Sequence, residues 1–259
     1  MGADQPVSGR ALSSGPQRRR GAMTAEPNDP TRAGTDWTDS GEGKVTLSRN
    51  EVETLCSKAA RGAGMSWGLA EEAGVAAGWL AARGIDGPAA LLTYLQTGVV
   101  DCRDRLVIMS DGWSRLEAGL LCPIALGAAI SDFAGTDLGP IGPSRVSLGS
   151  TAAPILLLPF LAGAARRTGQ SVCLDWEGGT AKVGPGEVAP DGVSELLGMQ
   201  HAEIGVQALS DTNIAHLPQT VCRLDRRVIE ALNGFAMKTT VPPSEKSRAD
   251  AGAGESDND

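Results

Sequence analysis

The chain has 259 residues, of which 41% are hydrophobic and 3% aromatic, and its formal net charge is −8. This length fits one large domain or two small ones, and the apolar fraction is sufficient for a core built mainly from aliphatic side chains. Because nucleic acids and anionic membrane surfaces attract clusters of Lys and Arg, the negative charge predicts neither of them as a partner.

No segment of the sequence has the length of a membrane span. The most apolar stretch, residues 152–165, contains Pro154 and Pro159 and is shorter than the roughly 20 apolar residues that a transmembrane helix needs. The N-terminus lacks the apolar region of a secretory signal. We therefore expect a soluble, cytoplasmic protein.

The two ends of the chain differ in composition from its middle. Residues 1–44 are rich in Gly, Ser, Pro, Asp and Thr and show no hydrophobic period, which is typical of a disordered leader, with Met23 as an alternative start to Met1. Residues 242–259 form an acidic, Gly-rich tail. A single domain is then expected over residues 45–241.

Helix-start signals follow the leader directly. Ser48 and Glu51 have the spacing of a capping box, which predicts a helix that ends near Gly62 or Gly64. Ser66 is the expected N-cap of a second helix, which continues toward Gly84.

The second helix is rich in Gly and Ala. Gly74 and Gly78 are four residues apart and therefore share a face on which another backbone can lie close. Asp86 is the expected cap of a third helix, with Pro88 in its first turn. Together these elements predict an N-terminal helical layer.

The rest of the sequence mixes strand and helix signals. Strands are predicted at residues 106–109, 145–148, 171–176, 180–183 and 203–209, and helices at residues 123–134, 154–167 and 226–236. Pro159 should kink or split the second of these helices. The expected fold class is α/β or α+β, with the helical layer packed against a small mixed sheet.

Cys122 is the strongest candidate for a catalytic residue. It precedes Pro123, which is favoured at the first position of a helix, so the thiol is expected at the N-cap, where backbone N–H groups and the helix dipole favour a thiolate. The alternative is a buried structural cysteine, which the apolar neighbours of Cys122 favour. The other four cysteines are scattered without a C-x-x-C pair and are expected to be free thiols.

Five further residues are candidates for a site. Glu71 and Glu72 could each act as a general acid or base, although acidic residues early in a helix more often balance its dipole on a solvated face. Trp67, Trp113 and Arg145 are candidate substrate-binding residues. The alternatives are core packing for the tryptophans and a solvated loop for the arginine.

Motifs for common cofactors are missing from the sequence. It contains no P-loop, no dinucleotide fingerprint and no nucleophile elbow. His201 and Glu203 match the H-x-E of zinc deaminases, but the P-C-x-x-C of that signature has no counterpart, since Pro218 is followed by Gln219. We therefore predict no metal, redox cofactor or nucleotide.

Residues 47–53 and 59–73, together with Leu121-Cys122-Pro123, resemble an uncharacterised proteobacterial family known as a domain of unknown function. The resemblance covers about residues 45–259. No activity is assigned to that family, so the resemblance implies no catalytic residues.

Two functions are therefore kept as expectations. The first is a small-molecule metabolic enzyme with a reactive Cys122. The second is a non-catalytic accessory or subunit protein that docks a partner through its Gly/Ala-rich second helix or its acidic tail. The sequence gives no oligomeric state.

Overall fold

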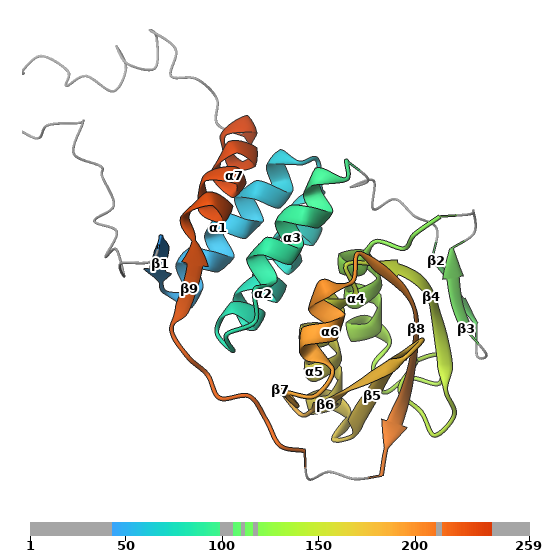
Figure 1. Cartoon of the computed structure of the whole chain (residues 1–259). Coiled ribbons are helices and arrows are strands. Elements are labelled where there is room, and N and C mark those ends of the chain that lie inside the picture. Colours follow the sequence, from blue (N-terminus) through green and yellow to red (C-terminus); the bar gives the residue numbers. More distant parts are fainter. Residues whose placement is uncertain (1–42, 99–105, 110–111, 116–118, 211–213, 240–259) are drawn as a thin grey trace, which may run out of the picture. The chain divides into compact units, whose positions relative to one another are not determined.

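The computed structural model describes residues 43–98, 106–109, 112–115, 119–210 and 214–239 (Figure 1). The predicted tail and all but the last two residues of the predicted leader lie outside these ranges. All of the described residues belong to one compact unit.

A group of four helices forms one layer of this unit (Figure 1). Its members are α1 (Arg49–Gly62), α2 (Trp67–Ala81), α3 (Gly87–Gln96) and α7 (Arg226–Ala236). The predicted capping box is confirmed, because the Ser48 N–H donates to Glu51 Oε2 at 2.7 Å and the Glu51 N–H donates to Ser48 Oγ at 3.2 Å. Asp86 likewise caps α3 by accepting from the Ala89 N–H.

The glycines of α2 allow this helix to pack directly on α1. A Cβ added at Gly74 would collide with Ser57 Oγ and with the carbonyl oxygen of Glu53, and one added at Gly78 would collide with the Glu53 side chain. The Gly/Ala face of α2 is therefore occupied by α1 of the same chain.

A two-stranded antiparallel sheet joins the two ends of the described chain. It consists of β1 (Lys44–Leu47) and β9 (Cys222–Asp225), with Lys44 opposite Asp225. The sequence reading missed both strands, because each is only four residues long and finds its partner at the far end of the chain. Lys44, the last residue of the predicted leader, is the first residue of β1.

A seven-stranded mixed sheet forms another layer, in the order β2-β3-β4-β8-β5-β6-β7. All neighbouring pairs are antiparallel except β3–β4, which is parallel. The strands are β2 (Leu106–Met109), β3 (Gly112–Arg115), β4 (Val146–Ala152), β5 (Ser171–Trp176), β6 (Gly179–Gly184), β7 (Glu187–Val188) and β8 (His201–Leu209). The fold is thus α+β, with a sheet larger than the small one expected.

Further helices lie between the helical layer and this sheet. They are α4 (Pro123–Phe133), the 3₁₀ helix η2 (Pro154–Leu157), α5 (Leu158–Thr168) and α6 (Val193–Gly198). Pro159 lies in the first turn of α5, so the predicted split of this helical segment is confirmed. These further helices contact the helical layer, because α2 packs against α4 and α5, and α3 packs against η2.

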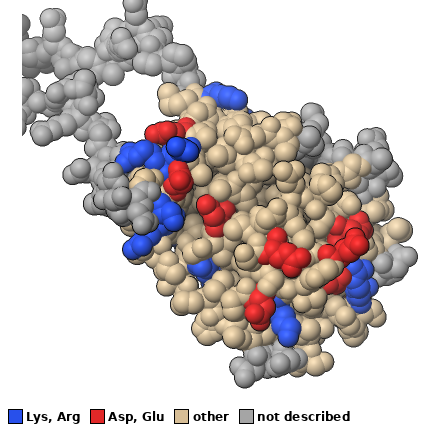
Figure 2. All heavy atoms as spheres, viewed as in Figure 1, with Lys and Arg blue, Asp and Glu red and all other residues tan. Residues whose placement is uncertain are grey.

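Within the described ranges, no helix is both long and apolar enough to cross a membrane. In Figure 2, many of the visible Lys and Arg side chains lie over β9 and α7, with some Asp and Glu side chains among them and others farther away on the same face.

Candidate functional site

Cys122 is the N-cap of α4, as the sequence predicts. Its backbone is extended, Pro123 follows at the first helical position, and the Ala125 N–H donates to Cys122 Sγ at 3.5 Å. The segment before it is fixed to β4, because the Leu121 N–H donates to the Ser150 carbonyl and the Leu121 carbonyl accepts from the Ala152 N–H. The thiol is therefore held by both the helix and the sheet.

A cavity of about 550 Å³ opens beside this thiol. It lies between α3, the segment that leads into α4, the end of β4, and the chain that connects α6 to β8. Only 3% of the Cys122 surface is exposed, so the residue is a buried wall of the cavity and not a surface thiol. Cys122 is thus buried in an apolar setting and also lines a cavity.

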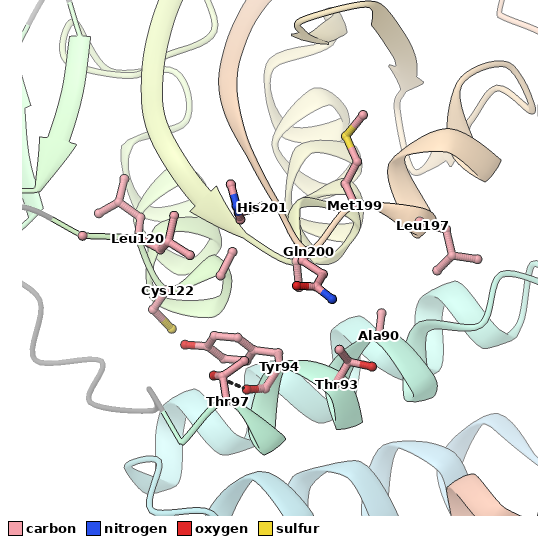
Figure 3. Close-up of a pocket in the computed structure, with 15 residues that line it drawn as sticks. Ala90, Thr93, Tyr94, Thr97, Leu120, Cys122, Leu197, Met199, Gln200 and His201 are labelled. Carbon is pink, nitrogen blue, oxygen red and sulfur yellow. Dashed lines mark hydrogen bonds between the residues drawn. The ribbon is translucent and has the colours of Figure 1, made fainter.

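Polar, uncharged side chains line the same cavity (Figure 3). Tyr94 on α3 is the only tyrosine of the sequence and is 3% exposed. In Figure 3 the hydroxyl end of its ring and the Cys122 side chain point toward one another. Thr97 packs beside Tyr94 and donates to its carbonyl oxygen at 2.7 Å. Gln200 and His201, at the start of β8, add an amide and an imidazole.

The cavity also contains strained backbone. Ala153 has φ 40° and ψ 58°, and no other described residue except glycine has a positive φ. Left-handed backbone at a residue with a Cβ costs of the order of 1–3 kcal/mol and persists only where its surroundings enforce it. Here the Ala153 N–H donates to the Gln200 carbonyl at 2.7 Å, which ties the end of β4 to the cavity wall opposite Cys122.

Glu71 and Trp67 lie elsewhere, at a second cavity of about 480 Å³ between α1 and α2. Trp67 is 68% exposed, and the Arg61 guanidinium carbon lies 5.1 Å from the centre of its ring. Glu72, next in the chain, lines neither cavity. Burial, followed by the charges of Asp132 and Glu71, raises the pKa of the Glu72 carboxyl.

Trp113 and Arg145 lie outside both cavities. Trp113 is 1% exposed in β3, and its ring meets Phe133 edge-on with a centroid distance of 5.9 Å. Arg145 lies over Gly205 on the exposed face of the sheet, where its Nη2 is 2.7 Å from Asp175 Oδ1. This hydrogen bond raises the pKa of the Arg145 guanidinium.

The other described cysteines are Cys56, Cys173 and Cys222. Burial raises the pKa of the Cys56, Cys173 and Cys222 thiols. Cys173 is half-buried on the exposed face of the sheet, which makes it a convenient internal reference thiol. In the described part of the chain, no group of three or more His, Cys, Asp or Glu side chains is arranged to hold a metal ion.

Three residues that line the cavity were not predicted from the sequence as site residues: Tyr94, Ala153 and Gln200. They come from α3, the end of β4 and the start of β8, and only the tertiary fold brings them to Cys122. The one available signal was that Tyr94 is a lone tyrosine in a chain with few aromatic residues.

Comparison with known proteins gives one match. No curated protein and no solved structure matches the chain. The sequence-based resemblance reaches to residue 259, whereas the family match ends at residue 125, just after the beginning of α4. Residues 47–125, which include α1, α2, α3 and Cys122, match the family described as Protein of unknown function (DUF3726).

Proposed function

We propose that the protein is an enzyme that acts on a small molecule bound in the cavity beside Cys122. The observation that carries the proposal is that the N-cap thiol of α4 lines a cavity of about 550 Å³. Ligand sites in proteins have volumes of roughly 300–1,000 Å³ and combine apolar walls with a few polar groups, as this cavity does.

In this proposal Cys122 is the reacting group. The backbone N–H groups at the start of α4 and the helix dipole favour the thiolate, which is the nucleophilic form. Tyr94 and Gln200 would orient the bound molecule by hydrogen bonds, and His201 lies at the exposed rim. A cysteine with this role fits a reducing cytoplasmic compartment, which is the location that we propose for the protein.

The proposal is tested by alkylation of the folded protein with iodoacetamide, with the labelled cysteines located by mass spectrometry. Thr93→Phe fills the cavity from an exposed position of α3, and Gln96→Phe adds the same ring to that helix outside the cavity. We expect Cys122 to be labelled in the wild type and in Gln96→Phe, and to be protected in Thr93→Phe. Labelling of Cys122 only after unfolding would contradict the proposal.

A second candidate, a non-catalytic protein that docks a partner, is favoured by the surface between α1 and α2. Trp67 and Val75 are exposed there beside Arg61, and exposed tryptophans are common anchors of protein interfaces. Since α1 occupies the Gly/Ala face of α2, a partner would contact the edge that carries Trp67. If a partner docks on this surface, Trp67→Ala should reduce the apparent mass of the native complex in lysate and leave the labelling of Cys122 unchanged.

A further inference from the structure

We infer that the ligand of the Cys122 cavity is an uncharged molecule with an apolar body and a hydrogen-bonding end. This inference rests on the proposed function, since it names the class of molecule that the same site would bind. It follows from the chemistry of the described cavity wall.

The described wall of the cavity carries no Lys, Arg, Asp or Glu. A carboxylate or phosphate that entered it would lose its water without gaining a counter-ion from these residues, and burial of an unpaired charge is strongly unfavourable. Cys122 and His201 are the only titratable groups of the described wall besides Tyr94, and His201 lies at the exposed rim. Among the side chains of the described wall, a carboxylate or phosphate therefore finds no cationic partner.

Apolar side chains form much of the remaining wall. Leu120 and Leu121 precede Cys122, and Leu197 and Met199 lie on the connection from α6 to β8. Because transfer of apolar surface out of water is favourable, contact with these side chains is the main source of affinity that the described wall offers.

The polar end of the ligand would lie toward α3 and Gln200. The Thr93 hydroxyl donates to the Ala89 carbonyl at 3.0 Å, which leaves its oxygen able to accept a further hydrogen bond. The Gln200 side chain carries two N–H donors and one acceptor, and it is exposed to the cavity (Figure 3). These groups suit a hydroxyl, amide or carbonyl.

The second cavity provides a contrast within the same chain. Its described wall holds Glu53, Lys58, Arg61 and Glu71, so charged molecules find counter-ions there. The described walls of the two cavities therefore differ in charge, which the overall composition of the chain does not explain.

A pair of fluorescent probes tests the inference. Phenylnaphthylamine is neutral, and anilinonaphthalene sulfonate has the same ring system with a negative charge. Binding of each is measured by fluorescence titration to the wild type, Thr93→Phe and Gln96→Phe. We expect phenylnaphthylamine to bind and Thr93→Phe to weaken its binding about tenfold or more. Gln96→Phe should leave that affinity unchanged, and sulfonate binding should not respond to Thr93→Phe.

Two results would overturn the inference. One is a sulfonate affinity that equals that of the neutral probe and is lost in Thr93→Phe, which would show that the cavity accepts an anion. The other is a neutral-probe affinity that does not respond to Thr93→Phe, which would show that the cavity does not bind apolar molecules. These two results are measured by probe binding. Failure of the proposed function is measured separately, by iodoacetamide labelling of the Cys122 thiol.

Discussion

At the scale of single residues, Cys122 combines two functions that usually belong to different side chains. Its sulfur accepts the Ala125 N–H as the cap of α4, and the same side chain lines the cavity. Ser, Thr, Asp and Asn are the preferred N-caps, so a cysteine at this position is not explained by capping strength.

Replacement of Cys122 separates its capping role from its chemistry. Cys122→Ser keeps an acceptor at the N-cap, whereas Cys122→Ala removes it and should lower the free energy of unfolding by about 1 kcal/mol relative to Cys122→Ser. Urea denaturation of the two variants measures this difference. An alanine variant as stable as the serine variant would show that the cap contributes nothing.

The backbone strain at Ala153 can also be measured. Because glycine adopts positive φ without a Cβ clash, Ala153→Gly should raise the free energy of unfolding by up to about 1 kcal/mol. Ala152→Gly is the matched control, since it adds backbone freedom within β4 and should destabilise the protein. If both variants are destabilised alike, Ala153 stores no strain.

Glu72 gives a prediction about pH. Its pKa is raised above the ordinary value of 4.5, so the folded state holds this proton more tightly than the unfolded chain and loses stability as pH rises through that window. Glu72→Gln should therefore be more stable than the wild type at neutral pH, and the difference should vanish below about pH 4.5. The exposed Glu230→Gln is the control, and thermal denaturation across pH is the measurement. A stability difference between Glu72→Gln and the wild type that is the same at all pH values would contradict the raised pKa of Glu72.

At the scale of elements, local signals predicted the described α-helices except the short α6 (Val193–Gly198), which was missed. The capping box at Ser48, the Asp86 cap and the proline positions at 123 and 159 all act within a few residues, so the sequence alone determines them. The strands β1, β3, β7 and β9 were missed because they have two to four residues each and depend on distant partners. The cavity was missed for the same reason, since its walls come from four separate segments.

The contact between α1 and α2 depends on Gly74. Gly74→Ala would gain about 1 kcal/mol of helix propensity but would collide with Glu53 and Ser57, so we expect a net loss of about 1–3 kcal/mol of stability. Gly234→Ala, in an exposed and open position of α7, should instead stabilise the protein. Denaturation curves of the two variants that shift in the same direction would contradict the close packing.

At the scale of the whole described unit, the helical layer is joined to the sheet by a few specific contacts. The Thr220 N–H donates to the Ala82 carbonyl, and the Leu217 N–H donates to the Val188 carbonyl. Arg83 spans the same junction. It is 7% exposed, stacks on the Trp79 ring at 3.7 Å and donates to the carbonyls of Trp79 and Gly186. Burial lowers the pKa of its guanidinium.

Loss of the Arg83 guanidinium should therefore weaken the junction. Arg83→Met keeps an aliphatic stem against Trp79 but removes two charge-assisted hydrogen bonds, and we expect it to cost about 1–3 kcal/mol. Arg49→Met, which removes an exposed ion pair with Glu53 within α1, should cost less than about 0.5 kcal/mol. Equal losses in chemical denaturation would show that the Arg83 hydrogen bonds stabilise the protein no more than an exposed ion pair does.

The central claim is that the cavity and the Cys122 thiol form one site. It is tested most directly by the rate of iodoacetamide labelling at Cys122 with and without saturating phenylnaphthylamine, with Cys173 as the reference thiol in the same sample. We predict that the bound probe slows labelling of Cys122 and leaves the labelling of Cys173 unchanged. A Cys122 rate that does not respond to the probe, or a fall in both rates together, would contradict it.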